Sequence, residues 1–214
     1  MRVLLFLILY FFTSPIIAQE FIPYVLLSQS VDNTTTNSWS GAVYKEDDNN
    51  YYVLSCAHGI KKEKDLIQVT LYNSNKKSQF MSIGTKSTFI KANYDYDLAM
   101  FSIEKFDRIF KIKPIKFNKN RPKGGERLLV RGYYLGNYYE NNVIYEDKDF
   151  SNLPIKFQTE SCVGEHYSGM SGSPLLNNEN NIVGIQLFKN NKSKGGHASL
   201  LMIEDFLGEH ILSR

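Results

Sequence analysis

The chain has 214 residues, of which 43% are hydrophobic and 14% aromatic, so it can bury a substantial core and is not a disordered protein. Its formal net charge is +3, and removal of the first eighteen residues, whose only charged side chain is Arg2, lowers that charge to +2. A nearly neutral chain lacks the strongly basic surface that nucleic-acid binding needs, so we expect no nucleic-acid partner.

The first eighteen residues have the layout of a secretory signal peptide. Arg2 precedes an apolar run from Val3 to Phe12, which is followed by Ser14-Pro15 and the small residue Ala18. We therefore expect cleavage after Ala18 and a secreted or periplasmic protein that does not stay at the membrane. The alternative is an uncleaved membrane anchor, but the apolar run is shorter than the ~20 residues of a spanning helix.

Short strands separated by polar turns follow from Trp39 onwards. The segments 39–46 and 51–60 favour strands, and the D-D-N-N sequence between them supplies a hairpin turn. Further strands are predicted over 65–73, 79–92 and 97–104.

A second series of strands is predicted over 125–136, 143–150, 154–162, 173–177 and 181–188. Only the tail, 201–214, has helical spacing of apolar residues, at Leu201, Phe206, Leu207 and Ile211. The join between the two series carries two prolines, several lysines and Gly-Gly. The prediction is an all-β chain of two halves, 19–115 and 116–214, with a C-terminal helix. Such short, regularly spaced strands are typical of barrels or a sandwich.

The sequence SGMSGSPLL, Ser168–Leu176, holds a candidate nucleophile, Ser171. A nucleophilic serine needs a base for its proton and backbone N–H donors beside it for the oxyanion. Both needs favour small neighbours, and Gly169 can adopt backbone angles that direct N–H groups into one pocket. Taken alone, the stretch is equally an ordinary glycine-rich hairpin.

Histidine is the usual base, and the chain has four: His58, His166, His197 and His210. His58 ends an apolar strand and precedes Gly59, which places it at the rim of a barrel, although a surface or packing role suits any single histidine. Asp97 directly precedes the apolar strand LAMFSI, where burial of a carboxylate needs a partner. We therefore expect Asp97 to orient His58 and Asp95 to be a solvated turn residue.

With His58, Asp97 and Ser171 in this order, the chain resembles the trypsin/chymotrypsin-like serine proteases over residues 39–212. The segment LSCAHGI is similar to that family's Thr-Ala-Ala-His, and DLAMFSI to its Asp-Ile-Ala-Leu strand. GMSGSP resembles the Gly-Asp-Ser-Gly-Gly-Pro loop, and its Gly-Ser-Pro ending resembles bacterial glutamyl endopeptidases. IVGIQLF resembles the strand that lines the substrate cleft.

The resemblance implies two packed six-stranded antiparallel barrels with the active site between them. It implies an exported serine endopeptidase that cleaves protein or peptide substrates through an acyl-enzyme, as a monomer and without cofactor or metal. Ser171 would be the nucleophile, His58 the general acid/base and Asp97 the orienting carboxylate. The N–H groups of Gly169 and Ser171 would form the oxyanion hole.

Two other classes compete with an endopeptidase. A catalytically silent, protease-like binding module usually lacks one member of the triad, and none is replaced here. An esterase of the α/β-hydrolase type is disfavoured, because the G-x-S-x-G elbow and the βαβ alternation are both missing from the sequence.

Two positions depart from the family pattern. Met170 stands where many members have an aspartate that pairs with a freshly cut N-terminus, so we expect no activation by that ion pair. The cysteine that usually follows the catalytic histidine is Gly59 here. The two cysteines present, Cys56 and Cys162, fall in different halves, and we expect free, buried thiols rather than a disulfide.

The resemblance says less about substrate preference. Glu165, six residues before the nucleophile, would lie at the base of the substrate pocket and favour Lys or Arg, but an insertion would place His166 or Tyr167 there. A solvated loop acid is the alternative for Glu165. Gln186 stands where glutamyl endopeptidases have a histidine, which argues against a glutamate preference. The remaining expected pocket residues are Phe188 on one wall and Gly195, Gly196 and His197 on the far side.

Overall fold

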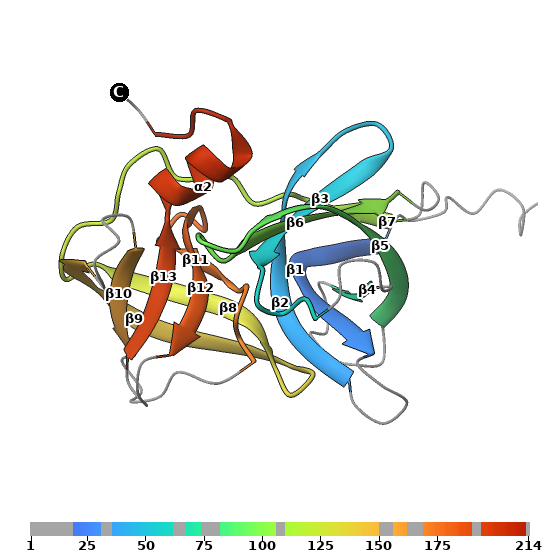
Figure 1. Cartoon of the computed structure of the whole chain (residues 1–214), viewed down its shortest axis with the longest axis horizontal. Coiled ribbons are helices and arrows are strands. Elements are labelled where there is room, and N and C mark those ends of the chain that lie inside the picture. Colours follow the sequence, from blue (N-terminus) through green and yellow to red (C-terminus); the bar gives the residue numbers. More distant parts are fainter. Residues whose placement is uncertain are drawn as a thin grey trace, which may run out of the picture.

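The computed structural model describes residues 19–30, 36–61, 67–73, 82–105, 110–149, 156–161, 169–189 and 194–212. The predicted signal segment, Cys162, Glu165, His166 and Tyr167 lie outside the described residues. Two β-structures lie side by side, and one short helix lies near their junction (Figure 1).

The first half contains β1 (Gln19–Ser30), β2 (Thr36–Glu46), β3 (Asn50–Cys56), β4 (Ile67–Asn73), β5 (Ser82–Asn93), β6 (Leu98–Glu104) and β7 (Phe110–Ile112). The strand order is β2-β3-β6-β5-β4-β1-β7. Because β1 also pairs with β2, the six antiparallel strands curl round on themselves, and the short β7 adds to β1 in parallel.

The second half contains β8 (Arg127–Tyr134), β9 (Asn137–Asp149), β10 (Lys156–Ser161), β11 (Pro174–Leu176), β12 (Ile182–Lys189) and β13 (Lys194–Ser199). These six strands form a closed barrel in the order β10-β13-β12-β11-β8-β9. Helix α2 (Leu200–Leu207) follows β13 directly. The predicted fold, two β-barrels and a C-terminal helix, is confirmed.

Helix α2 is shorter than the sequence predicted. Ser199 begins it by accepting a hydrogen bond from Met202 N, and Gly208 ends it in the left-handed conformation, φ 73°. Its buried face consists of Leu200, Met202, Ile203 and Phe206, so only Phe206 of the predicted stripe is buried. No helix among the described residues is long and apolar enough to cross a membrane.

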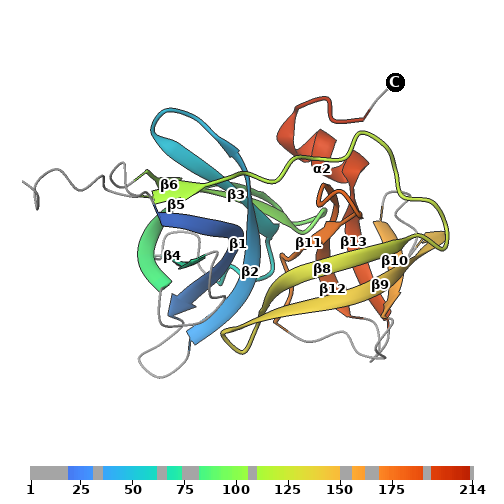
Figure 2. The ribbon, with the colours of Figure 1, turned by 180° about the vertical axis from the view of Figure 1, so that it is seen from behind.

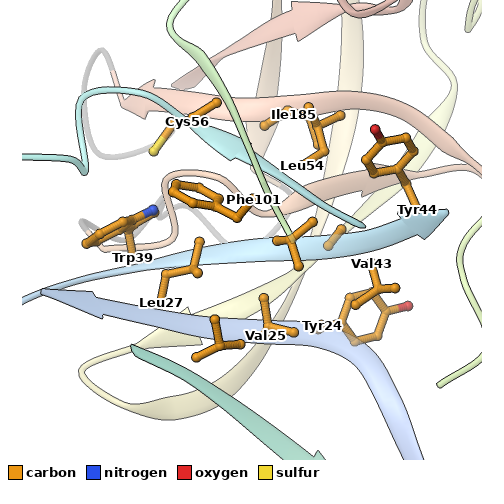
Figure 3. Packing of buried hydrophobic residues seen from close by; sticks show 14 of the residues in the cluster. Tyr24, Val25, Leu27, Trp39, Val43, Tyr44, Leu54, Cys56, Phe101 and Ile185 are labelled. Carbon is orange, nitrogen blue, oxygen red and sulfur yellow. The ribbon is translucent and has the colours of Figure 1, made fainter. Parts of the chain in front are cut away.

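One hydrophobic cluster joins the two halves. In Figure 3, Leu54 and Cys56 of β3 lie in the same cluster as Ile185, which comes from β12 of the second barrel. Three buried residues of α2, Met202, Ile203 and Phe206, belong to this cluster as well. A smaller cluster lies within the second barrel and includes Met170. The shared burial of apolar area therefore holds the two barrels in one arrangement.

The connection between the barrels is hydrogen-bonded to both of them. Figure 2 shows it crossing from the end of β7 to the start of β8. Ile115 N donates to Val43 O at 2.9 Å in the first barrel. Three residues later, Asn118 N donates to Ile182 O at 2.8 Å in the second. This connection is therefore part of the interface between the barrels.

Candidate active site

His58 and Asp97 meet at the edge of the first barrel. Strand β3 ends at Cys56, and the chain turns immediately afterwards, which leaves the His58 side chain half-exposed. Asp97 is the last residue of the turn between β5 and β6. His58 Nδ1 lies 2.7 Å from Asp97 Oδ2, so the structure brings the predicted base and its predicted partner together.

The Asp97 carboxylate is held in place by backbone donors. Oδ1 accepts hydrogen bonds from Ala57 N at 3.1 Å and His58 N at 2.8 Å. The Asp97 backbone has φ 57°, a left-handed conformation that costs most L-residues about 1–2 kcal/mol. The two hydrogen bonds that Oδ1 accepts, from Ala57 N and His58 N, offset this strain and leave Oδ2 directed at the imidazole.

Gly59 is explained by its neighbour Trp39. A Cβ atom at Gly59 would lie 2.5 Å from the Trp39 ring, so no larger residue can occupy the position without moving the indole. Asn37 Nδ2 donates to Gly59 O at 2.6 Å and fixes the same turn. Close packing against Trp39 is therefore the reason for a glycine directly after His58.

Ser171 lies in a tight turn whose backbone requires glycine. Ser173 N donates to Met170 O at 3.0 Å, and Gly172 has φ 84°, the signature of a type II turn with glycine at its third position. The turn is tied to the first barrel by Ser40 N, which donates to Ser171 O at 2.8 Å. Gly172 N donates to Gln186 O at 2.7 Å and ties the turn to β12.

Gly172 also packs directly against the first barrel. A Cβ atom there would lie 2.0 Å from Ser40 O and 2.3 Å from Ser55 Oγ. Ser55 is three residues before His58, so the loop that carries Ser171 contacts the strand that carries His58. The loop that carries Ser171 and the segment that carries His58 therefore lie next to one another at the interface of the two barrels.

We expect Gly172→Ala to lower the free energy of unfolding by about 3 kcal/mol or more, because strain and a backbone clash add together. Gly125→Ala is the matched control, since Gly125 has φ 81° with nothing within 4 Å of its missing Cβ. It should cost only the left-handed strain, about 1–2 kcal/mol. Urea denaturation of both variants measures the difference, and equal losses would contradict the close packing at Gly172.

The residues before Ser171 are positioned by burial and by backbone conformation. Met170 is 1% exposed and packs in the cluster inside the second barrel. Gly169 has φ 97°, which is open to glycine but rare for other residues. Within the described residues, the N–H groups of Gly169 and Ser171 donate no hydrogen bond.

The side chains of Ser171 and His58 are not joined in this structure. Ser171 Oγ donates to Leu187 O at 3.0 Å, and His58 Nε2 lies 3.8 Å from Cys56 Sγ. The hydrogen bond with Asp97, followed by the contact with Cys56, raises the pKa of His58 to about 10. An imidazole in this arrangement is protonated at neutral pH. Cys56 itself is buried and free.

The described residues of the predicted substrate pocket lie on β12 and β13. Gln186 and His197 are directly opposite one another in the pairing of these strands, and both are buried. Gln186 Oε1 has no hydrogen-bond partner among the described residues. The Phe188 ring lies over Gly196, where a Cβ would be 2.5 Å from the ring edge. These four residues are therefore neighbours beside the Ser171 loop.

Two buried serines at the junction of the barrels were not predicted from the sequence. Ser40 and Ser55 are fully buried, and Tyr133 N donates to Ser40 Oγ at 2.8 Å. Their signal was small polar residues within otherwise apolar strands, WSGAVY and YYVLSCA. The approach of Cys56 to His58 was not predicted either, because β3 ends at Cys56 and the alternation of side chains along the strand does not extend to His58.

A sequence model described as Trypsin-like peptidase domain matches residues 39–185, which is more than half of the chain. The chain belongs to this family. No curated protein matches it in sequence. Among the described residues of this trypsin-like peptidase, no group of His, Cys, Asp or Glu could hold a metal ion.

Solved proteases share the fold of this trypsin-like peptidase. The active form of Rv3671c protease from M. tuberculosis superposes with a TM-score of 0.66 at 16% identity, covering 90% of this chain and 82% of that one. The MamO protease domain from Magnetospirillum magneticum gives 0.62 at 17%, covering 86% and 95%. Identities this low establish the fold alone.

Proposed function

We propose that this trypsin-like peptidase is an exported serine endopeptidase that uses Ser171, His58 and Asp97. The observation that carries the proposal is the pairing of His58 with Asp97 at 2.7 Å, on a strand end that packs against the Ser171 loop. Export, to a secreted or periplasmic location, rests on the signal-like pattern of residues 1–18. Action as a monomer on a protein or peptide substrate completes the proposal.

The reaction begins with reorientation of two side chains. Before the serine reacts, His58 releases its Nε2 proton to solvent, because only the neutral imidazole is a base. Ser171 Oγ then leaves Leu187 O, and His58 Nε2 turns away from Cys56, so that Nε2 can accept the serine proton. Oγ then bonds to the substrate carbonyl carbon, and the oxyanion accepts hydrogen bonds from the N–H groups of Gly169 and Ser171. Asp97 holds Nδ1–H and supports the imidazolium.

Collapse of the tetrahedral intermediate breaks the carbon–nitrogen bond, and His58 gives the proton to the leaving amine. Water, deprotonated by His58, then attacks the acyl-enzyme and releases the carboxylic acid and Ser171. The substrate side chain would lie beside Gln186 and His197, with Phe188 and Gly196 at the cleft wall. Glu165 and His166 remain predicted pocket residues outside the described part of the chain.

The alternative is a silent binding module, which the Ser171–Leu187 hydrogen bond favours because it leaves the serine without a base. A fluorophosphonate probe separates the two, since it labels only an activated serine. We expect labelling of Ser171 in the folded wild type. We also expect cleavage of a peptide library, in which the cleaved sequences show which side chain the pocket prefers. Absence of both labelling and cleavage in folded protein would favour the binding module.

The pKa of His58 predicts how activity and stability depend on pH. Protonated His58 cannot accept a proton, so kcat/KM should rise as pH increases from 7 towards 10. Stability should move the other way. Because the folded pKa of about 10 lies above the ordinary 6.5, the protonated form stabilises the fold fully below pH 6.5, and this contribution is lost as pH rises through 10.

Hydrolysis rates and denaturation midpoints measured from pH 6 to 10.5 test both trends on one sample. Cys56→Ala is the informative variant, because the thiol is the second cause of the raised pKa of His58. It should move the activity profile to lower pH. A profile that is unchanged in Cys56→Ala would show that the thiol contact does not control the base.

A further inference from the structure

We propose that helix α2 of the second half positions the catalytic carboxylate of the first, through Tyr96 and Lys91. This inference rests on the function proposed for His58 and Asp97. It assigns no contact with substrate to either residue, so both are positioning residues rather than catalytic ones.

The first contact is made by the residue next to Asp97. Tyr96 OH donates to Asp205 Oδ2 on α2 at 2.6 Å. The Tyr96 ring packs against the shared hydrophobic cluster, and Tyr96 N donates to Asn93 Oδ1 at 3.0 Å. The turn before Asp97 is thus fixed at both its backbone and its side chain.

The second contact is made by the strand that leads into the turn. Lys91 Nζ on β5 donates to Phe206 O at 2.5 Å and lies 4.7 Å from the centre of the Phe206 ring. A cation at this end of a helix satisfies a carbonyl that has no partner within the helix, and it is favoured by the helix dipole. Lys91 therefore holds the last turn of α2 against β5.

Both contacts lie next to Asp97, or on the strand that leads to it, and Asp97 has a strained backbone. Asp97 has φ 57°, and such a conformation persists only where its surroundings over-determine it. From the first barrel, Ala57 N and His58 N fix the carboxylate. From the second half, α2 fixes the preceding residue. Loosening the α2 contacts should let the turn relax and weaken the hydrogen bond between Asp97 and His58.

Tyr96→Phe removes only the hydroxyl and keeps the ring packing. We expect kcat to fall about fivefold with KM unchanged, because small misplacements of a catalytic group are costly while substrate contacts are unaltered. The pKa of His58, followed by NMR titration of labelled histidine, should fall in the same variant. Asp205→Ala should lower kcat and the pKa of His58 in the same way. Asp205→Asn keeps an acceptor oxygen for the Tyr96 hydroxyl, so both quantities should stay near their wild-type values.

Glu209→Gln is the matched control. Lys45 and Glu209 form a surface ion pair at 2.5 Å that also joins the segment after α2 to the first barrel, but away from the Asp97 turn. It should leave kcat and the pKa of His58 unchanged. If Tyr96→Phe alters neither readout, or only stability, the inference is overturned. If the pKa of His58 shifts in a protein that cleaves no peptide, the positioning stands and the proposed function fails.

Discussion

Replacing Ser171 with alanine is expected to lower kcat by about 10⁶-fold, because the nucleophile and its base act as a unit. The fold should survive, since the Ser171 hydroxyl makes one hydrogen bond among the described residues, to Leu187 O, and its loss should cost no more than about 1.5 kcal/mol. Burst and steady-state kinetics on a peptide identified by library profiling give the rate, and denaturation gives the stability.

Ser173→Ala is the control in the same turn. Ser173 is fully buried, and its Oγ has no hydrogen-bond partner among the described residues. Its removal should leave kcat close to wild type and should not reduce stability. A loss of activity shared by both alanine variants would indicate damage to the loop, and retained activity in Ser171→Ala would refute the assignment of the nucleophile.

Asp97→Asn carries the second largest expected effect, a fall in kcat of about 10⁴-fold. Asparagine can still accept the hydrogen bonds from Ala57 N and His58 N through Oδ1. Its amide nitrogen, however, is a donor and cannot accept from His58 Nδ1–H. The neutral imidazole then carries its proton on Nε2, so Nε2 cannot accept the proton of Ser171. The pKa of His58 should fall in the same variant, because its largest cause is removed.

Asp95→Asn provides the comparison within the same turn. Asp95 is exposed and two residues from Asp97, so the change removes one surface charge and should leave kcat and the pKa of His58 near wild type. Peptide-hydrolysis assays give kcat for both variants, and NMR titration of labelled histidine gives the pKa of His58. Equal effects at the two positions would mean that general charge, rather than the hydrogen bond at 2.7 Å, determines the behaviour of His58.

The β-rich halves were predictable because short strand-favouring segments bounded by polar turn residues are a local property of the chain. Strands β1, β7 and β13 were not predicted, for three different reasons. Pro23 interrupts the pattern of β1, β7 has only three residues in a lysine-rich join, and KGGHAS in β13 has few residues that favour strands. Each of them forms because a neighbouring strand supplies hydrogen bonds, and that information is non-local.

The site shows the same division. His58, Asp97 and Ser171 could be proposed from sequence, since each sits at a strand end or in a turn with distinctive neighbours. What the sequence does not determine is which hydrogen bonds and contacts these side chains make. Nothing in LSCAHGI indicates that Cys56 approaches His58 Nε2, or that Ser171 bonds to Leu187 O. The role of Tyr96 depends on α2, more than a hundred residues away, as the 109-residue separation from Asp205 shows.

Met170, buried inside the second barrel, has a consequence for the conditions under which the nucleophile loop keeps its shape. An apolar anchor carries no proton to lose and no charge for salt to screen. The loop should therefore keep its conformation in acid and in concentrated salt, where an ion-paired loop would loosen. Hydrophobic burial instead weakens on cooling, so low temperature is the condition to which this loop is most sensitive.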